Sequence, residues 1–398
     1  MKSIILVLLF LLSLTSHASA ETTTNIQEIR ISLDSVWVVV GGILVFFMQA
    51  GFALIESGSV RSKNTVNVLM KNYMDTCIGG IIFWLFGFGL MFGLNQTGWI
   101  GLSHFMPDQL DDWHWNLLFF QMMFAATATT IASGAMAERI HFVAYVVSAI
   151  FVSGVIYPIF GSWAWGGLFG GDGWLKSLGF IDFAGSTVVH SIGGWVALAG
   201  IIVLGPRLGR FGRKGQSHFL AGHNLPLVAL GGFILWFAWF GFNAASTVAA
   251  SVSIGRIALN THLAACAAAS TYMILALLQS KAVLMRHTIN ASLAGLVAIT
   301  AGCATMSPPF AIITGAIAGF LITFVPQFIE KMQLDDVVDA VTVHGVCGAW
   351  GTLAAGIFFE KALFNLDIIL VQALGVGAAL IWGFGASFIM LGLTQYYL

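Results

Sequence analysis

Charged residues are scarce in this chain. Only 8% of its 398 residues are Asp, Glu, Lys or Arg, and 58% are hydrophobic, whereas about a quarter of an ordinary soluble domain is charged. A soluble fold of this size cannot bury so much apolar surface, so the sequence predicts a protein whose main solvent is lipid. The net charge of −1 provides no basic field of the kind that attracts nucleic acid.

Cysteine and the motifs of enzymes are also scarce. The 4 cysteines, Cys77, Cys266, Cys303 and Cys347, lie in separate apolar runs and show neither a CxxC pair nor zinc-ligand spacing, so they are predicted to be small core residues. The sequence contains no Ser-His-Asp set, nucleotide-binding loop or cluster of metal ligands. We therefore expect no enzyme, no metal and no cofactor.

The first twenty residues predict a separate element. The stretch "MKSIILVLLFLLSLTSHASA" has one basic residue, a short leucine-rich core and an Ala-Ser-Ala end, which is the pattern of a cleaved signal peptide. Residues 1–20 are thus expected to be removed after Ala20, and residues 21–398 to form one membrane domain. An uncleaved first helix is the alternative.

Long apolar runs dominate the remaining chain. They are continuous rather than alternating, which excludes a strand barrel and predicts an all-α integral membrane protein. Each is long enough, the shortest with some strain, to cross a hydrocarbon core of about 30 Å. Eleven such segments are predicted, at residues 35–57, 75–94, 115–136, 142–160, 185–204, 224–242, 257–280, 289–305, 308–329, 337–358 and 368–393.

The distribution of Lys and Arg predicts the orientation. With the N-terminus outside, the inner loops are predicted around residues 58–74, 137–141, 205–223, 281–288 and 330–336. Eleven basic residues then fall in the inner loops and only four in the outer segments, as the positive-inside rule requires. The odd number of segments then leaves the C-terminus inside.

Two segments resemble each other. "DFAGSTVVHSIGG" at 182–194 and "DVVDAVTVHGVCG" at 336–348 both have Asp, then Val-His eight residues later, then Gly four residues after the His. His190 and His344 lie on the fifth and tenth predicted segments, which run in opposite directions. This predicts an inverted five-helix repeat, with both histidines near the membrane centre because eight residues of helix span about 12 Å.

Three roles remain open for an intramembrane histidine at this point. A hydrogen bond between helices is one, and a metal site is another, although two neutral imidazoles without a third ligand hold a metal poorly. The third is a polar line that passes a small solute through an apolar lumen. Asp182 and Asp336 begin their segments, where a carboxylate caps free N–H groups; attraction of a cation is also open to Asp182, near the outer mouth.

These motifs resemble the ammonium transporter (Amt/Mep/Rh) family. "DFAGSTVVHSIGGWVALAG…GPR" is similar to its signature, and "MQAGFALIESGSVRSKN" at 48–64, "GAMAER" at 134–139 and "WFGFNAAS" at 239–246 agree with it. The resemblance covers nearly the whole mature chain and is stronger to the Amt branch than to the Rh branch.

The resemblance implies roles for individual residues. His190 and His344 match the family's twin pore histidines, and Phe124 and Phe242 match the outer and inner phenylalanines of its pore gate. The family's outer ammonium-binding site is matched, besides Phe124, by Trp165, Ser246 and Asp182.

The function that the resemblance implies is ammonium transport across the cell inner membrane by a homotrimer with one pore per subunit. NH4+ is expected to bind at the outer site, lose its proton, and pass as NH3 along the histidines while the proton moves separately, so that the cycle is electrogenic. The alternatives are an ammonium sensor domain of a longer signalling protein and an Rh-like channel for neutral gas.

The end of the sequence affects the expected partners. The chain stops at "TQYYL", almost where its last apolar segment ends, as an excerpt of a longer protein would. In the family a cytoplasmic tail helps to bind PII-type regulators, so such a partner cannot be inferred for this chain.

Overall fold

The described part of the chain is helical. The computed structural model describes the backbone of residues 2–397 and the side chains of residues 26–396. Among these residues the extended pairing is limited to one antiparallel bridge, between Phe211 and Ser217, in agreement with the predicted all-α class. The predicted signal peptide, residues 1–20, lies outside the residues whose side chains are described.

The chain folds into α-helices joined by short π-helical and 3₁₀ segments. The α-helices are α1 (Lys2–Ser59), α2 (Thr65–Ile82), α3 (Phe88–Phe92), α4 (Asp112–Ala135), α5 (Phe142–Phe151), α6 (Tyr157–Trp165), α7 (Trp174–Ser177), α8 (Ile192–Leu204), α9 (Leu225–Ala244), α10 (Ile254–Leu278), α11 (Met285–Ile299), α12 (Pro308–Lys331), α13 (Cys347–Ile357) and α14 (Leu366–Tyr397). The π-helical segments are η2 (Phe83–Gly87), η3 (Val152–Ile156), η4 (Ser186–Ser191) and η6 (Val341–Val346), and the 3₁₀ segments are η1 (Ser62–Asn64) and η5 (Ala245–Thr247).

Nine helical stretches in the described part of the chain are long and apolar enough to cross a membrane. Two of the eleven predicted segments are shorter: α11 has 15 residues, and η6 with α13 forms the apolar helix Val341–Ile357. The protein is thus a multi-pass membrane protein, whereas a count of eleven crossings remains a prediction.

Two predictions about α2 were wrong. The segment 58–74 was expected to be a loop, but α2 begins at Thr65 and holds Lys71 and Asn72, both buried. A lysine in a sequence suggests a loop, but here the Lys71 Nζ donates a hydrogen bond to the backbone oxygen of Ser133 on α4 (3.1 Å) and lies 4.8 Å from the centre of the Tyr145 ring on α5. Cys77, expected in the core, is exposed, and Cys266 is half-buried; Cys303 and Cys347 are buried as predicted.

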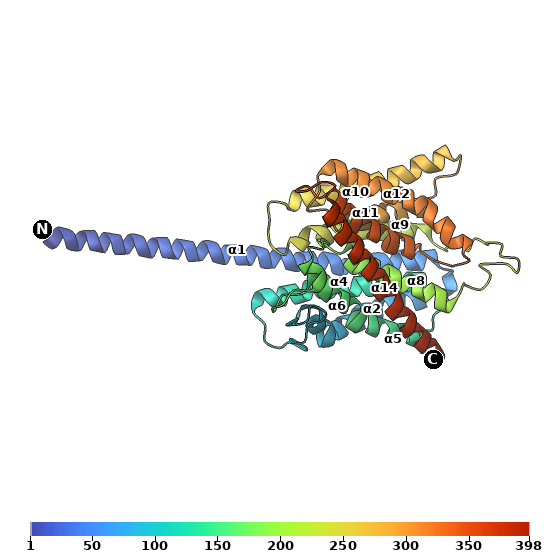
Figure 1. Cartoon of the computed structure of the whole chain (residues 1–398), viewed down its shortest axis with the longest axis horizontal. Coiled ribbons are helices and arrows are strands. Elements are labelled where there is room, and N and C mark those ends of the chain that lie inside the picture. The colour runs from blue at the N-terminus through green and yellow to red at the C-terminus, as the bar shows by residue number, and fades with distance from the viewer. Residues whose placement is uncertain (1, 398) are drawn as a thin grey trace.

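Small residues let the helices approach closely. A Cβ atom added to Gly315 would lie 2.1 Å from the carbonyl oxygen of Ala264, and one added to Gly319 would lie 2.4 Å from that of Ala268. The backbones of α12 and α10 therefore touch, as small-xxx-small pairs allow. Figure 1 shows the helices gathered into one bundle, with α14 slanting across the face turned to the viewer.

Capping side chains mark several helix starts. Asp111 accepts a hydrogen bond from the backbone N–H of His114 at the start of α4 (2.9 Å), and Asn224 accepts one from Leu227 at the start of α9 (3.1 Å). Each satisfies an N–H group that has no partner within its own helix. The two capped helices carry the phenylalanines of the predicted gate, Phe124 on α4 and Phe242 on α9.

Candidate functional site

The two histidines of the sequence repeat lie on corresponding elements. His190 is in η4 and His344 is in η6, and each π-helical segment continues into an α-helix, α8 or α13. The two elements cross in contact, because a Cβ atom on Gly194 would lie only 2.2 Å from the backbone nitrogen of Gly345. π-helical turns are rare and occur often at functional sites. The close crossing brings the two imidazole rings together.

The imidazoles form a buried pair. The Nδ1 atoms of His190 and His344 are 3.2 Å apart and the ring centroids 5.3 Å apart, and the side chains are 0% and 6% exposed. A hydrogen bond between two Nδ1 atoms requires one to carry the proton and the other to accept it. The two Nε2 atoms then differ, one being an acceptor and the other a donor. His190 Nε2 is buried and has no protein partner, so it is available to a small solute.

Aromatic rings continue the line on both sides of the histidines. The rings of Phe124 and Phe242 are stacked, with centroids 4.1 Å apart and an interplanar angle of 18°, and both are at most 1% exposed. The Phe242 ring lies 5.2 Å from that of His190. On the far side, the ring of Phe52 lies 6.0 Å from that of His344. We call these five residues the ring file.

Trp165 and Ser246 lie at the phenylalanine end of the ring file. The Trp165 ring is 6.3 Å from that of Phe124, edge to face, and its Nε1 donates a hydrogen bond to the carbonyl oxygen of Asp182 (2.7 Å). Ser246 is half-buried and its Oγ donates to the carbonyl oxygen of Phe242 (2.8 Å). Because that bond uses the hydroxyl proton, the oxygen can still accept a hydrogen bond.

Asp182 serves as a cap. Its Oδ1 accepts from the backbone N–H groups of Gly185 and Ser186, and its Oδ2 from those of Thr187 and Val188, at 2.8–3.0 Å. Four hydrogen bonds occupy the carboxylate of Asp182, which is 6% exposed. It therefore provides acceptors for the free backbone N–H groups at the start of η4 and does not point at a solute. Of the two roles left open by the sequence, the geometry favours capping; Asp182 reaches the site through its carbonyl bond to Trp165.

Asp336, the counterpart of Asp182, is bound less completely. Its Oδ2 accepts from the backbone N–H of Val341 (2.7 Å), while its Oδ1 is buried and has no partner. Burial and the neighbouring charge of Asp339 raise the pKa of Asp336 to about 6. The two halves of the repeat therefore share a cap position but not its full set of bonds.

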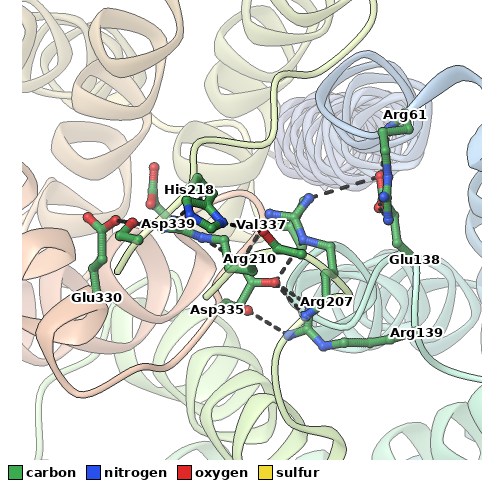
Figure 2. A network of polar contacts seen from close by, with 12 residues as sticks. Arg61, Glu138, Arg139, Arg207, Arg210, His218, Glu330, Asp335, Val337 and Asp339 are labelled. Atoms are coloured by element: carbon green, nitrogen blue, oxygen red, sulfur yellow. Dashed lines mark hydrogen bonds and ion pairs between the residues drawn. The ribbon is translucent and has the colours of Figure 1, made fainter. Parts of the chain in front are cut away.

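The loops near Asp336 are tied together by arginines and carboxylates. Asp335, 1% exposed, accepts hydrogen bonds from Arg207 Nε (2.8 Å) and Nη2 (3.0 Å), and its backbone oxygen accepts from Arg139 Nη2 (2.6 Å). Glu138 accepts from the backbone and the side chain of Arg61 at 2.6 and 2.7 Å. Figure 2 shows Arg207 between Asp335 and the pair formed by Arg61 and Glu138. We call this end of the bundle the arginine end.

Some ring neighbours were missed by the sequence reasoning. Trp239 stacks on His190 with centroids 5.0 Å apart, and its Nε1 donates to Thr300 Oγ1 (3.0 Å). It stands in the quoted motif "WFGFNAAS", but a single tryptophan among 13 gives no signal of its contact. The sequence likewise gives no signal of the contact between Phe52 and His344, because that contact depends on how α1 packs. No group of three or more potential metal ligands was found among the described residues.

Comparisons with known proteins identify the family. The model of the Ammonium Transporter Family matches residues 36–398. The chain belongs to the ammonium transporter family. It is 45% identical over 380 residues to the ammonium transporter Amt2 of Archaeoglobus fulgidus, covering 92% of this chain and 79% of that protein. It is 39% identical over 333 residues to ammonium transporter 1 member 4 of Arabidopsis thaliana, covering 77% and 65%.

Solved structures agree with the family assignment. A structure titled "Sensor Amt Protein" superposes with a TM-score of 0.91 at 42% identity and covers 93% of this chain and 95% of that chain. The crystal structure of Candida albicans Mep2 superposes with a TM-score of 0.82 at 27% identity, covering 90% and 83%. This member of the family therefore has the helical fold of Amt and Mep proteins.

Proposed function

We propose that this protein transports ammonium as NH3 and a separately moving proton, so that one charge crosses for each ammonium. The observation that carries the proposal is the ring file: two stacked phenylalanines lie directly before a buried pair of histidines. A carboxylate in the file would favour a bare cation, but every member is aromatic or an imidazole. Such a passage makes charge costly and accepts a neutral molecule with hydrogen-bonding capacity.

The recruitment site in this proposal lies at the Trp165 end. The indole face attracts a cation by about 0.5–2 kcal/mol, and Ser246 Oγ accepts an N–H. NH4+ resembles K+ in size and charge, but only NH4+ can release a proton. Loss of that proton before the phenylalanine stack then acts as the filter, and the histidine pair accepts from and donates to the NH3 that follows.

The topology in this proposal has eleven crossings, an inverted five-helix repeat, an outer N-terminus and an inner C-terminus. The arginine end is then the inner face, since Arg61, Arg139 and Arg207 gather there, as the positive-inside rule expects. A homotrimer in the cell inner membrane, with residues 1–20 removed, completes the assignment. The match to the ammonium transporter family supports the multi-pass membrane character of this assignment.

A current measurement tests the proposal. The protein is reconstituted in liposomes and pulsed with ammonium, with potassium as the control. We expect a sustained inward current with ammonium and none with potassium, growing with protein density. A rapid change of internal pH without current would contradict charge movement and favour a neutral gas channel.

A second candidate is an ammonium sensor. The 42% identity to the structure titled "Sensor Amt Protein" over 93% of this chain favours it, because the same outer site serves binding without flux. A brief capacitive spike that does not grow with protein density, together with measurable ammonium binding, would support the sensor against the transporter.

A further inference from the structure

A buried polar cluster lies beside the ring file, among α1, α2, α4 and α5. Its ionisable members are Glu56 on α1 and Lys71 and Asp75 on α2, with exposed fractions of 2%, 0% and 0%. The transport pathway proposed above uses none of them. We call the following residues the buried cluster: Glu56, Lys71, Asn72, Asp75, Thr130, Ser133 and Tyr145.

Hydrogen bonds join the buried cluster across four helices. Glu56 Oε2 accepts from Asn72 Nδ2 (3.0 Å) and Ser133 Oγ (2.9 Å). Lys71 Nζ donates to the backbone oxygen of Ser133 (3.1 Å) and lies 4.8 Å from the centre of the Tyr145 ring. A second set of contacts surrounds Asp75 Oδ2, which lies 2.6 Å from Tyr145 OH and 2.9 Å from Thr130 Oγ1.

The charges of the buried cluster do not balance if every group is ionised. Two carboxylates face one ammonium group, and the nearby Arg139 is already paired with Asp335. An uncompensated carboxylate in a buried site is costly, and such a group takes up a proton instead. Charge balance therefore requires one of Glu56 and Asp75 to be neutral.

The hydrogen-bond donors indicate which carboxyl group holds the proton. Asn72 Nδ2 donates to Glu56 and to the backbone oxygen of Val68, so Asn72 Oδ1 faces Thr130 Oγ1 at 3.1 Å. The single hydroxyl proton of Thr130 cannot serve both Asn72 Oδ1 and Asp75 Oδ2. A proton on Asp75 Oδ2 supplies the missing donor, because Asp75 then donates to Thr130 and Thr130 donates to Asn72.

We propose that the buried cluster is a proton-binding site that retains one proton on Asp75 at neutral pH, with Glu56 and Lys71 ionised. Glu56 Oε1 and Asp75 Oδ1 are buried and without partners, so neither carboxyl group is saturated by protein donors. Glu56 lies one helical turn from Phe52, whose ring contacts that of His344. The proton on Asp75 thus keeps the buried cluster electrically neutral. Through Glu56 this cluster holds α1, and with it Phe52, beside the histidine pair.

Infrared difference spectroscopy of the purified full chain at neutral pH tests the proposal without reference to transport. Asp75→Asn preserves the shape of the side chain and is expected to remove the carbonyl stretch of one protonated carboxyl group. Glu56→Gln is expected to remove the same band, because Asp75 then ionises to balance Lys71. Thr130→Val, which deletes the acceptor, is expected to shift the band without removing it. The matched control is Asp112→Asn, an exposed carboxylate, which loses no protonated band.

Opposite results overturn the inference. If Asp75→Asn removes only the bands of an ionised carboxylate, Asp75 holds no proton. If Glu56→Gln retains the protonated band at full intensity, charge balance with Lys71 does not set the proton count. Elution of each variant as folded protein is checked first by size-exclusion chromatography, and Glu56→Gln and Thr130→Val decide the question if Asp75→Asn does not fold.

Discussion

The Nδ1 atoms of His190 and His344 lie 3.2 Å apart although 154 residues separate them in the chain. One nitrogen must donate and the other accept, so only one of the two rings carries a proton at Nδ1. This arrangement fixes opposite hydrogen-bonding characters for the two Nε2 atoms.

Replacing His190 by alanine tests the pair. The substitution removes the hydrogen bond to His344 and the buried Nε2, each worth about 0.5–1.5 kcal/mol, so we expect ammonium current to fall by about tenfold. Currents in liposomes at equal protein density measure it. His262→Ala is the control, because this exposed histidine on α10 lies outside the ring file; an equal loss there would contradict the assignment.

Replacing Phe124 by alanine removes one ring of the stack. Phe242 then no longer closes the file against hydrated ions, and we expect potassium to carry current where it carried none. The measurement is the ratio of ammonium to potassium current. Phe233→Ala, at an exposed position of α9, should leave the ratio unchanged. Unaltered selectivity in Phe124→Ala would rule out a gate at this stack.

Replacing Asp182 by alanine separates capping from cation attraction. Four backbone N–H groups lose their acceptor, so we expect a loss of about 1–3 kcal/mol in stability, visible as a lower Tm without ammonium present. A role in cation attraction alone would instead weaken ammonium binding and leave the Tm unchanged.

Gly194→Ala tests the crossing of the two histidine-bearing elements. A Cβ at this position would lie 2.2 Å from Gly345 N, and backbone cannot move aside cheaply, so we expect both lower Tm and lost transport. Gly377→Ala on α14 is the matched control, since its Cβ would meet no atom within 4 Å. If Gly194→Ala behaves like the control, the close approach does not matter.

The arginine end should respond to acid. Burial alone would raise the pKa of Asp335, but hydrogen bonds and charge from Arg207 and Arg139 outweigh it and hold that pKa below its usual range. A carboxyl group with a depressed folded pKa stabilises the protein above its unfolded pKa of about 3.9 and loses that contribution as pH falls further. We expect Asp335→Asn to cost about 3–5 kcal/mol at neutral pH.

Thermal unfolding between pH 7 and pH 3 measures this effect. The Tm difference between the wild type and Asp335→Asn should be constant down to about pH 5 and shrink below about pH 4. A difference that grows on acidification would contradict the sign. Asp367→Asn, in the exposed first turn of α14, serves as the control.

The sequence by itself determined the all-α class of fold and the family to which the chain belongs, whereas the roles of the site residues stay predictions. The length of the continuous apolar runs predicted membrane-spanning helices, because a chain with only 8% charged residues must use lipid as its main solvent. The shared spacing from Asp to His to Gly related His190 to His344, and their depth in the membrane stays a prediction. The expected continuous helix from Asp182 to His190 was wrong, because the chain becomes helical only at Ser186, where η4 begins. The predicted loop at 58–74 was wrong because one-dimensional charge cannot show that Lys71 has partners on three other helices.

Only the tertiary structure decided how these residues meet. Phe52 and Trp239 contact the histidines because α1 and α9 pack there, and no local pattern encodes such contacts. Asp182 and Asp336 look alike in sequence, yet one carboxylate binds four N–H groups and the other leaves an oxygen unpaired. Contacts between distant segments depend on the packing of whole helices, whereas spacing within one helix is fixed by its own geometry.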